Sequence, residues 1–159
     1  MKIDLRRAEP QDCKRIWRWR NEKEVRKVSL HFQKIPFPAH KIWFEKRLES
    51  SENRMLIGVN GRKKPFGCVR LDHLRKGTAE IHIFLKKSSR GKGLGRVLLH
   101  QACRYGFQRL RLKKIIAHIK PDNPRSLRVF EKVGFELQGT RRVRHVKLLR
   151  FMFENNEDE

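Results

Sequence analysis

The chain has few of the features that mark secreted, metal-binding or membrane proteins. Its cysteines, Cys13, Cys68 and Cys103, are widely spaced and form no C-x-x-C pair, which argues against a disulfide framework or a zinc site and favours a reducing compartment. The polar start MKIDLRRAEPQD contains no apolar core typical of a signal peptide. No apolar run reaches the ~18 residues of a membrane span. We therefore expect a cytoplasmic protein with no metal and no membrane partner.

Acidic residues are scarce, with 17 Asp and Glu against 40 Lys and Arg, so the formal net charge is +23. A field of this sign attracts polyanions and repels polyamines. Nucleic acid, a phosphate-rich cofactor, an anionic substrate and a generally basic surface without a polyanion site all agree with it. From the length we expect one domain over residues 1–153, followed by a disordered acidic tail over 154–159.

The hydrophobic pattern predicts an α/β domain with one mixed sheet. A short strand and a helical stripe, interrupted near Asn21, come first, and a second helix follows a proline-containing loop. Three strands then lead to a glycine-rich turn and a long helix, and a strand, a helix and a final pair of strands end the chain. The expected strands are 2–7, 55–59, 65–71, 79–86, 114–119 and two within 135–153; the expected helices are 11–28, 39–49, the one ending near 110, and 124–132.

The glycine-rich turn is the most informative segment. The strand-like run 81–85 is followed by Arg-Gly-Lys-Gly-Leu-Gly over 90–95 and then by a helical pattern. Such a junction can direct unpaired N–H groups, a helix dipole and cationic side chains at one point, as a pyrophosphate requires. The spacing G-x-G-x-G matches neither the dinucleotide fingerprint nor the P-loop. A plain strand-to-helix connection is the alternative.

A second segment, Asn-Pro-Arg-Ser-Leu-Arg-Val-Phe-Glu-Lys-Val-Gly-Phe over 123–135, follows at a characteristic distance. Together the two segments closely resemble the GNAT superfamily of acetyl-CoA-dependent N-acyltransferases, over roughly residues 3–153. The resemblance implies a GNAT-like domain with a mixed sheet of about seven strands, flanked by about four helices and splayed between strands 4 and 5. It also implies that acetyl-CoA is the cofactor.

The resemblance assigns cofactor contacts residue by residue. The pantetheine arm would pair with backbone at Phe84 and Leu85, and the pyrophosphate would lie on the turn with added charge from basic side chains. Asn123 would contact the cofactor arm, although it also fits an N-cap followed by Pro124. Phe130 stands where many relatives have a tyrosine that acts as general acid. The expected cofactor-binding residues are Phe84, Leu85, Arg90, Gly91, Lys92, Gly93, Leu94, Gly95, Arg96, Asn123 and Phe130.

Glu80 is the candidate general base. On an extended strand Glu80, His82 and Phe84 share one face, and relatives place a carboxylate at the corresponding point near the substrate amine. His82 is a second candidate because its unperturbed pKa of ~6.5 suits proton transfer. The alternatives are a strand carboxylate paired with an arginine and a packed or solvated histidine. With Phe130 in place of the tyrosine, thiolate departure needs no side-chain acid, since a thiol pKa near ~8.5 makes a tolerable leaving group.

The N-terminal third would form the acceptor side. Its pattern W-R-N…V-R…H-x-x-W-F resembles enzymes that acetylate the 4-amino group of UDP-linked amino sugars, where tryptophans stack on a ring and arginines hold a diphosphate. The alternatives are core packing of the tryptophans, acetylation of a protein amino-terminus as in ribosomal-protein acetyltransferases, and a nucleic-acid-binding module on this scaffold. Monomer and homodimer both remain open. The expected acceptor residues are Trp17, Arg18, Arg20, Asn21, Arg26 and Trp43.

Overall fold

The computed structural model describes residues 2–30 and 32–156. Its α-helices are α1 (Cys13–Arg20), α2 (Lys23–Val28), α3 (Phe37–Glu49), α4 (Leu94–Arg109) and α5 (Pro124–Val133), with short 3-10 turns η1 (Pro10–Asp12) and η2 (Lys87–Ser89). Its strands are β1 (Asp4–Arg7), β2 (Arg54–Val59), β3 (Pro65–Arg75), β4 (Thr78–Leu85), β5 (Lys114–Ile119), β6 (Glu136–Val143) and β7 (Val146–Glu154).

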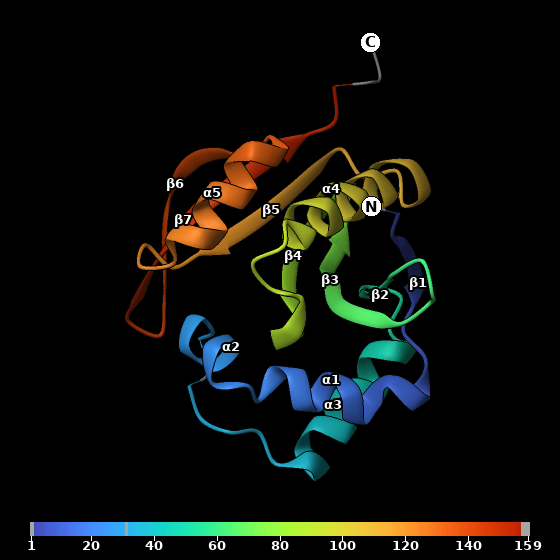
Figure 1. Cartoon of the computed structure of the whole chain (residues 1–159). Coiled ribbons are helices and arrows are strands. Elements are labelled where there is room, and N and C mark those ends of the chain that lie inside the picture. The colour runs from blue at the N-terminus through green and yellow to red at the C-terminus, as the bar shows by residue number, and fades with distance from the viewer. Residues whose placement is uncertain (1, 31, 157–159) are drawn as a thin grey trace.

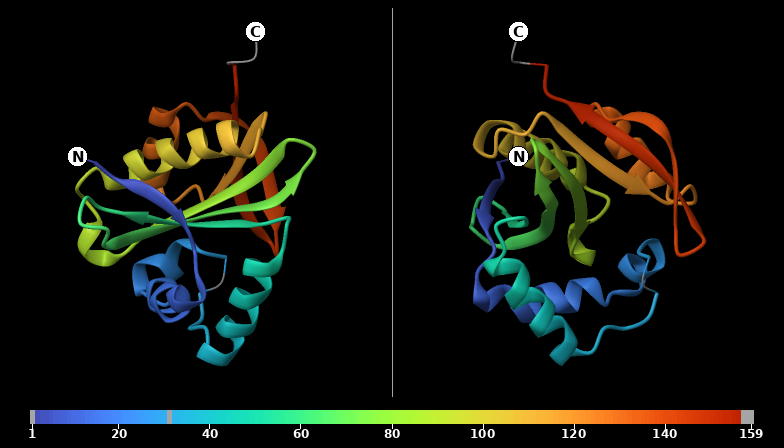
Figure 2. Two further views of the ribbon diagram at one scale, coloured as in Figure 1. Left: turned by 90° about the vertical axis from the view of Figure 1, so that its right-hand side faces the viewer. Right: turned by 180° about the vertical axis from the view of Figure 1, so that it is seen from behind.

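All seven strands form one sheet in the order β1-β2-β3-β4-β5-β7-β6. The pairing of β4 with β5 is parallel, and every other pairing is antiparallel. The predicted mixed α/β sheet is thus confirmed. Helices α4 and α5 lie on one face of the sheet, and α1 and α3 lie on the other (Figures 1 and 2).

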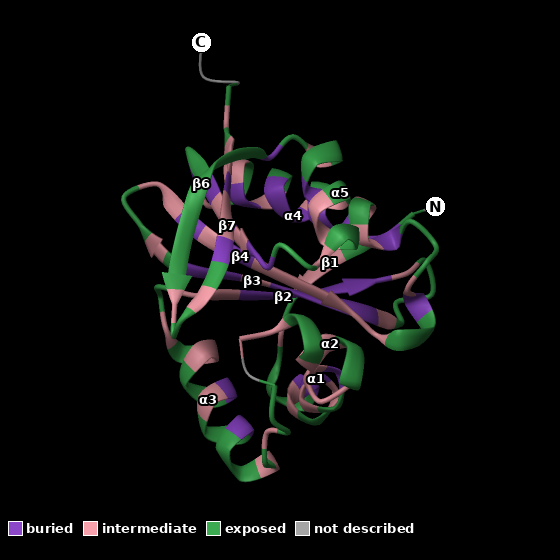
Figure 3. Cartoon of the chain, turned by 90° about the vertical axis from the view of Figure 1, so that its left-hand side faces the viewer, coloured by how far each residue is buried: buried purple, intermediate pink, exposed green. Residues whose placement is uncertain are grey.

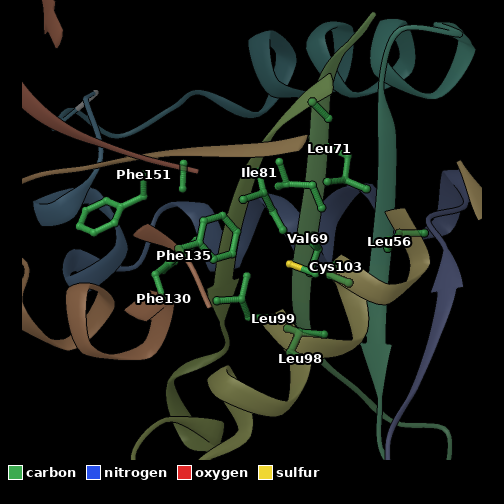
Figure 4. Packing of buried hydrophobic residues seen from close by; sticks show 14 of the residues in the cluster. Leu56, Val69, Leu71, Ile81, Leu98, Leu99, Cys103, Phe130, Phe135 and Phe151 are labelled. Atoms are coloured by element: carbon green, nitrogen blue, oxygen red, sulfur yellow. The ribbon is translucent and has the colours of Figure 1, made fainter. Parts of the chain in front are cut away.

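Two hydrophobic clusters hold these layers together. The larger one joins α4 and α5 to the sheet, and Leu98 and Leu99 of α4 lie against Val69 and Ile81 in its centre (Figure 4). The smaller one joins α1 and α3 to the opposite face, where Ile16 belongs to the same buried group as Phe44, Ile57 and Cys68. The sheet, including β4, therefore lies between two packed layers of helices.

Strands β4 and β5 are paired only along the first part of β4. Their register runs only from Thr78↔Lys114 to Glu80↔Ile116, whereas β4 stays paired with β3 as far as Gly67↔Leu85. Strand β5 continues beside β7 to Ile119↔Leu149. The predicted splay between strands 4 and 5 is confirmed, and beyond Glu80 one edge of β4 has no strand beside it.

Some element boundaries differ from those predicted. The helix expected over 11–28 is two helices, because the chain turns at Asn21 between α1 and α2; this gives five α-helices where about four were expected. Strand β7 continues to Glu154, and the Asn155 N–H donates to the Lys113 carbonyl oxygen at 2.9 Å. Residues 157–159 of the predicted tail lie outside the described residues.

Strand β6 forms an open edge of the sheet. Residues 136–142 are all exposed (Figure 3), and β6 pairs on one side only, with β7.

Among the helices of residues 2–30 and 32–156, none has the length and apolar character needed to cross a membrane.

Candidate active site

The turn between β4 and α4 has the backbone geometry expected of an anion cradle. Gly91 and Gly93 have φ of +74° and +77°, a backbone conformation that residues other than glycine rarely adopt. A Cβ built at either position would meet no atom within 4 Å. Gly93 is also the N-cap of α4, and no side chain caps this helix. The N–H groups of its first turn are therefore available to a phosphate group.

Arg90, which the resemblance assigns to the phosphates, lies at the start of this turn and forms an ion pair. Its Nη2 lies 2.6 Å from Glu22 Oε2 and donates to the Leu85 carbonyl oxygen at 2.8 Å. The pair ties the turn to the junction of α1 and α2. Lys92 on the same turn and Arg96 in the first turn of α4 are both exposed, so both side chains are accessible to an anion.

A cavity of about 560 Å³ lies next to this ion pair. It is bordered by Trp19 and Glu22 at the end of α1 and by Lys86, Lys87 and Ser88 after β4. The hollow thus adjoins the end of β4, where the cofactor arm was predicted, and the segment that leads into the glycine turn. The backbone conformation, the uncapped helix and this hollow all fit a molecule with a pyrophosphate.

The two predicted cofactor contacts on α5 have structural partners. Asn123 is the N-cap of α5, and its Oδ1 accepts from the Ser126 N–H at 3.4 Å. Phe130 is 4% exposed and packs edge-on against Phe135, with 4.9 Å between ring centroids. The capping alternative for Asn123 agrees with this geometry, and the Phe130 ring is part of the core.

Replacing Phe130 with Leu should therefore change stability and leave the chemistry intact. The smaller side chain loses part of the aromatic packing, so we expect the free energy of unfolding to fall by about 1–2 kcal/mol. We expect kcat for acetyl transfer to change by less than about twofold, because a phenyl ring carries no proton. Denaturant unfolding and steady-state kinetics measure the two quantities. A large pH-dependent fall in kcat of the folded variant would contradict this assignment.

Glu80 occupies the last paired position before β4 and β5 diverge. Its Oε1 accepts from His118 Nδ1 on β5 at 3.0 Å and lies 3.5 Å from His82 Nε2. Burial alone would raise the pKa of Glu80, but the hydrogen bond from His118 and the charge of His82 outweigh it and lower the pKa to about 2. Glu80 is consequently ionised at neutral pH.

The polar network continues from Glu80 across β4 to β3. His82 Nε2 also lies 3.5 Å from Asp72 Oδ2, and Asp72 forms ion pairs with Arg47 at 2.8 Å and Arg70 at 3.6 Å. Burial and the charge of Arg70 lower the pKa of His82 to about 4. At neutral pH His82 is therefore a neutral ring between two carboxyl groups.

Trp43 on α3 is surrounded by arginines. The guanidinium carbons of Arg20, Arg70 and Arg47 lie 4.1, 5.2 and 5.4 Å from the centre of its ring. These distances are those of cation–π contacts. Since Arg47 and Arg70 also pair with Asp72, Trp43 and Arg20 lie at the far end of the network that begins at Glu80.

A fully buried histidine, His40, fixes the position of Arg20. His40 Nε2 lies 2.9 Å from the Cys13 carbonyl oxygen. Since a carbonyl can only accept, Nε2 carries the proton, and Nδ1 accepts from Arg20 Nη1 at 3.1 Å. Burial lowers the pKa of His40 to about 4, which keeps this arrangement at neutral pH.

The other predicted acceptor residues do not lie in this network. Trp17 Nε1 and the Asn21 amide donate to the Ile35 carbonyl oxygen at 2.6 and 2.9 Å, and Arg26 donates to the carbonyl oxygens of Asn21 and Phe32 at 3.0 Å each. These three hold the connection between α2 and α3. Arg18 is exposed. Of the predicted acceptor set, the structure brings Arg20 and Trp43 together with Glu80's network.

His40 is the histidine of the H-x-x-W-F pattern, but the sequence did not reveal its contact with Arg20. Sequence reasoning did not single out the other residues that complete the network: Arg47, Arg70, Asp72 and His118. Alternation along β5 offered a signal for one of them, because buried Ile115 and Ala117 place His118 on the opposite face. Within residues 2–30 and 32–156, no group of three or more His, Cys, Asp and Glu could hold a metal ion.

The chain is similar in sequence to known acetyltransferases. The chain is 25% identical to spermidine N(1)-acetyltransferase of Vibrio cholerae over 139 residues, which cover 86% of this chain and 80% of that one. It is 21% identical to acetyltransferase PseH of Campylobacter jejuni over 127 residues, covering 80% and 78% of the two chains.

One solved structure and one family model complete the comparison. The crystal structure of the Vibrio cholerae spermidine N-acetyltransferase with CoA and spermine matches in fold with a TM-score of 0.87, at 23% identity, over 96% of this chain and 95% of that one. The sequence model of the acetyltransferase (GNAT) domain matches residues 2–136. With the splayed sheet and the glycine turn in place, the chain belongs to the GNAT family and is an N-acetyltransferase of amines that uses acetyl-CoA.

Proposed function

We propose that this enzyme acetylates the primary amine of a small acceptor and that Glu80 receives the proton the amine must lose. The position of Glu80 carries the proposal: its carboxylate stands where β4 and β5 diverge, on the polar face of β4. An ammonium has no lone pair, so it must be deprotonated before it can attack a carbonyl carbon. An ionised carboxylate beside it both attracts the ammonium and accepts its proton.

The neighbours of Glu80 suit this role. His82 is neutral at neutral pH and lies 3.5 Å from Glu80, so it can receive the proton from the carboxyl group and pass it on. His118 fixes the orientation of Glu80 through its hydrogen bond. Glu80 and His82 are both weak bases, with pKa values of about 2 and about 4. His82 is the stronger of the two, so it can take the proton from Glu80 and release it to water.

On the donor side, acetyl-CoA supplies the acetyl thioester. We place its phosphates on the N–H groups after Gly93 and on Lys92 and Arg96, and its arm along the open edge of β4 beside Leu85. In this scheme Phe130 offers no proton to the thiolate. A thiol pKa near ~8.5 makes departure possible without a side-chain acid.

The acceptor is the finer part of the proposal. Relatives named spermidine N(1)-acetyltransferase favour a polyamine. The W-R-N…H-x-x-W-F pattern, which resembles sugar-nucleotide enzymes, favours a UDP-linked amino sugar, and a protein amino-terminus remains a third candidate.

The three candidate acceptors differ in the inhibition that we expect from UDP. We expect acetyl-CoA consumption with a small primary amine; for an amino-sugar nucleotide, millimolar UDP should compete with the acceptor and not with acetyl-CoA. A polyamine or peptide acceptor should be insensitive to UDP. Steady-state inhibition patterns across a panel of amino-sugar nucleotides, polyamines and peptides measure this. Absence of acetylation with every amine class would overturn the proposed function itself.

A further inference from the structure

The arginine cluster around Trp43 has more positive than negative charge. Arg47 and Arg70 share one carboxylate, Asp72. Among the described residues, no carboxylate lies within 4.0 Å of Arg20, whose partners are His40 and the Trp43 ring. A histidine that stays neutral and an aromatic ring cannot neutralise a guanidinium. Arg20 is therefore a cation without a counterion.

The position of this cation is fixed, and it is partly removed from water. His40 and Trp43 hold its guanidinium from two sides. Burial and the nearby charge of Arg70 lower the pKa of Arg20 to about 10, so it still carries its charge at neutral pH. Holding a desolvated charge without a partner costs free energy, and an incoming anion would recover it. The arrangement is that of a preorganised anion site.

This site is part of the same polar surface as Glu80. Ion pairs and close polar contacts lead from Glu80 through His82 and Asp72 to Arg70, and Arg70 and Arg20 both lie against Trp43. An acceptor that follows this network would have its amine at Glu80 and a negative group at Arg20. A polyamine would instead bring a second ammonium towards three arginines, which like-charge repulsion opposes.

We propose that Arg20, with Arg70 beside it, is an anion subsite of the acceptor site, so that the acceptor is an amine that also carries a carboxylate or phosphate group. This inference rests on the proposed function, because it places the amine at Glu80. It differs from the sequence-based expectation of a diphosphate held by Arg18, Arg20 and Arg26, since Arg18 is exposed and Arg26 is engaged by backbone carbonyls.

Matched amines test the subsite. O-Phosphoethanolamine against ethanolamine, and 4-aminobutyrate against butylamine, differ by the anionic group; spermidine supplies the polycation. We expect kcat/KM to favour the anionic member of at least one pair by about tenfold or more. Arg20→Gln should remove this preference, because it lowers kcat/KM for the anionic amines by more than for the neutral ones. Spermidine surpassing every anionic amine, or a preference that survives Arg20→Gln, would overturn the subsite.

Two further variants separate binding from a structural role. Lys46→Gln removes one positive charge from an exposed position on α3 and should leave the preference intact. Arg20→Lys keeps the charge and should restore part of it, mainly through KM. If Arg20 only supported the fold, Arg20→Gln would lower activity with neutral and anionic amines equally, and that result would contradict the proposal.

A binding measurement keeps the subsite testable even if no amine is acetylated. With the protein saturated with CoA, which occupies the glycine turn, inorganic phosphate should raise the Tm of the wild type and of Lys46→Gln. It should not raise the Tm of Arg20→Gln. If no amine is acetylated but phosphate still raises the Tm of the wild type, the proposed function is wrong and the anion site stands. If phosphate does not raise the Tm of the wild type, the anion site is wrong.

Discussion

Replacing Glu80 with Gln should lower kcat/KM for the acceptor amine by roughly 10²–10⁴, with little change in acetyl-CoA affinity. The amide keeps the size of the side chain but can neither accept the proton nor attract the ammonium. Steady-state kinetics together with calorimetric titration of acetyl-CoA measure both quantities. A loss below about threefold in a folded variant would show that Glu80 is dispensable.

Parallel variants identify how the proton leaves. His82→Gln should lower kcat/KM by less than Glu80→Gln does if His82 only relays the proton, and by more if His82 is itself the base.

The pH dependence of the free energy of unfolding adds a structural check on Glu80. Because the folded state lowers the pKa of Glu80 from 4.5 to about 2, its stabilising contribution is present above about pH 4.5 and is lost as the pH falls towards 2. Glu80→Gln should lose less stability across that window than the wild type.

Gly93→Asp should abolish acetyl-CoA binding. The new side chain would occupy open space at the first turn of α4 and would bring a negative charge to the point where phosphates bind. The left-handed backbone adds strain of about 1–2 kcal/mol. Calorimetry on the folded variant measures the effect, and unchanged affinity would remove the glycine turn as the phosphate site.

Gly77→Asp is the matched control for this variant. Gly77 has the same φ of +77° but lies in the turn between β3 and β4, away from α4's N-terminus. It should show a comparable loss of stability with normal acetyl-CoA affinity. Gly93→Ala, which adds strain without charge, should bind acetyl-CoA with an affinity between those of Gly93→Asp and the wild type.

Much of the fold could be predicted because its signals are local. Alternation placed Glu80 and His82 opposite Ile81 on β4, and the structure buries Ile81 against α4 while the two polar residues face β3's polar side chains. The glycine spacing and the helix that follows predicted the cradle. The splay came from the family resemblance, since no pattern within β4 or β5 marks where their pairing ends.

The parts that could not be predicted depend on contacts between distant segments. Nothing near Arg90 in the sequence reveals Glu22 as its ion-pair partner. The role of His40 depends on a carbonyl at Cys13 and a guanidinium at Arg20. Long-range ion pairs of this kind follow from packing, and a sequence with 40 basic residues offers too many candidate partners for each acid.

The Glu22–Arg90 ion pair has a consequence for the coupling between donor and acceptor binding. It joins the α1–α2 junction, which borders the proposed acceptor side, to the turn on which we place the phosphates of the donor. We expect a shift of either segment on binding to be carried to the other through this ion pair, which would link the two ligands thermodynamically. By reciprocity, the factor by which donor binding changes acceptor affinity equals the factor by which the acceptor changes donor affinity. Breaking the pair with Glu22→Gln should bring that cooperativity factor closer to one.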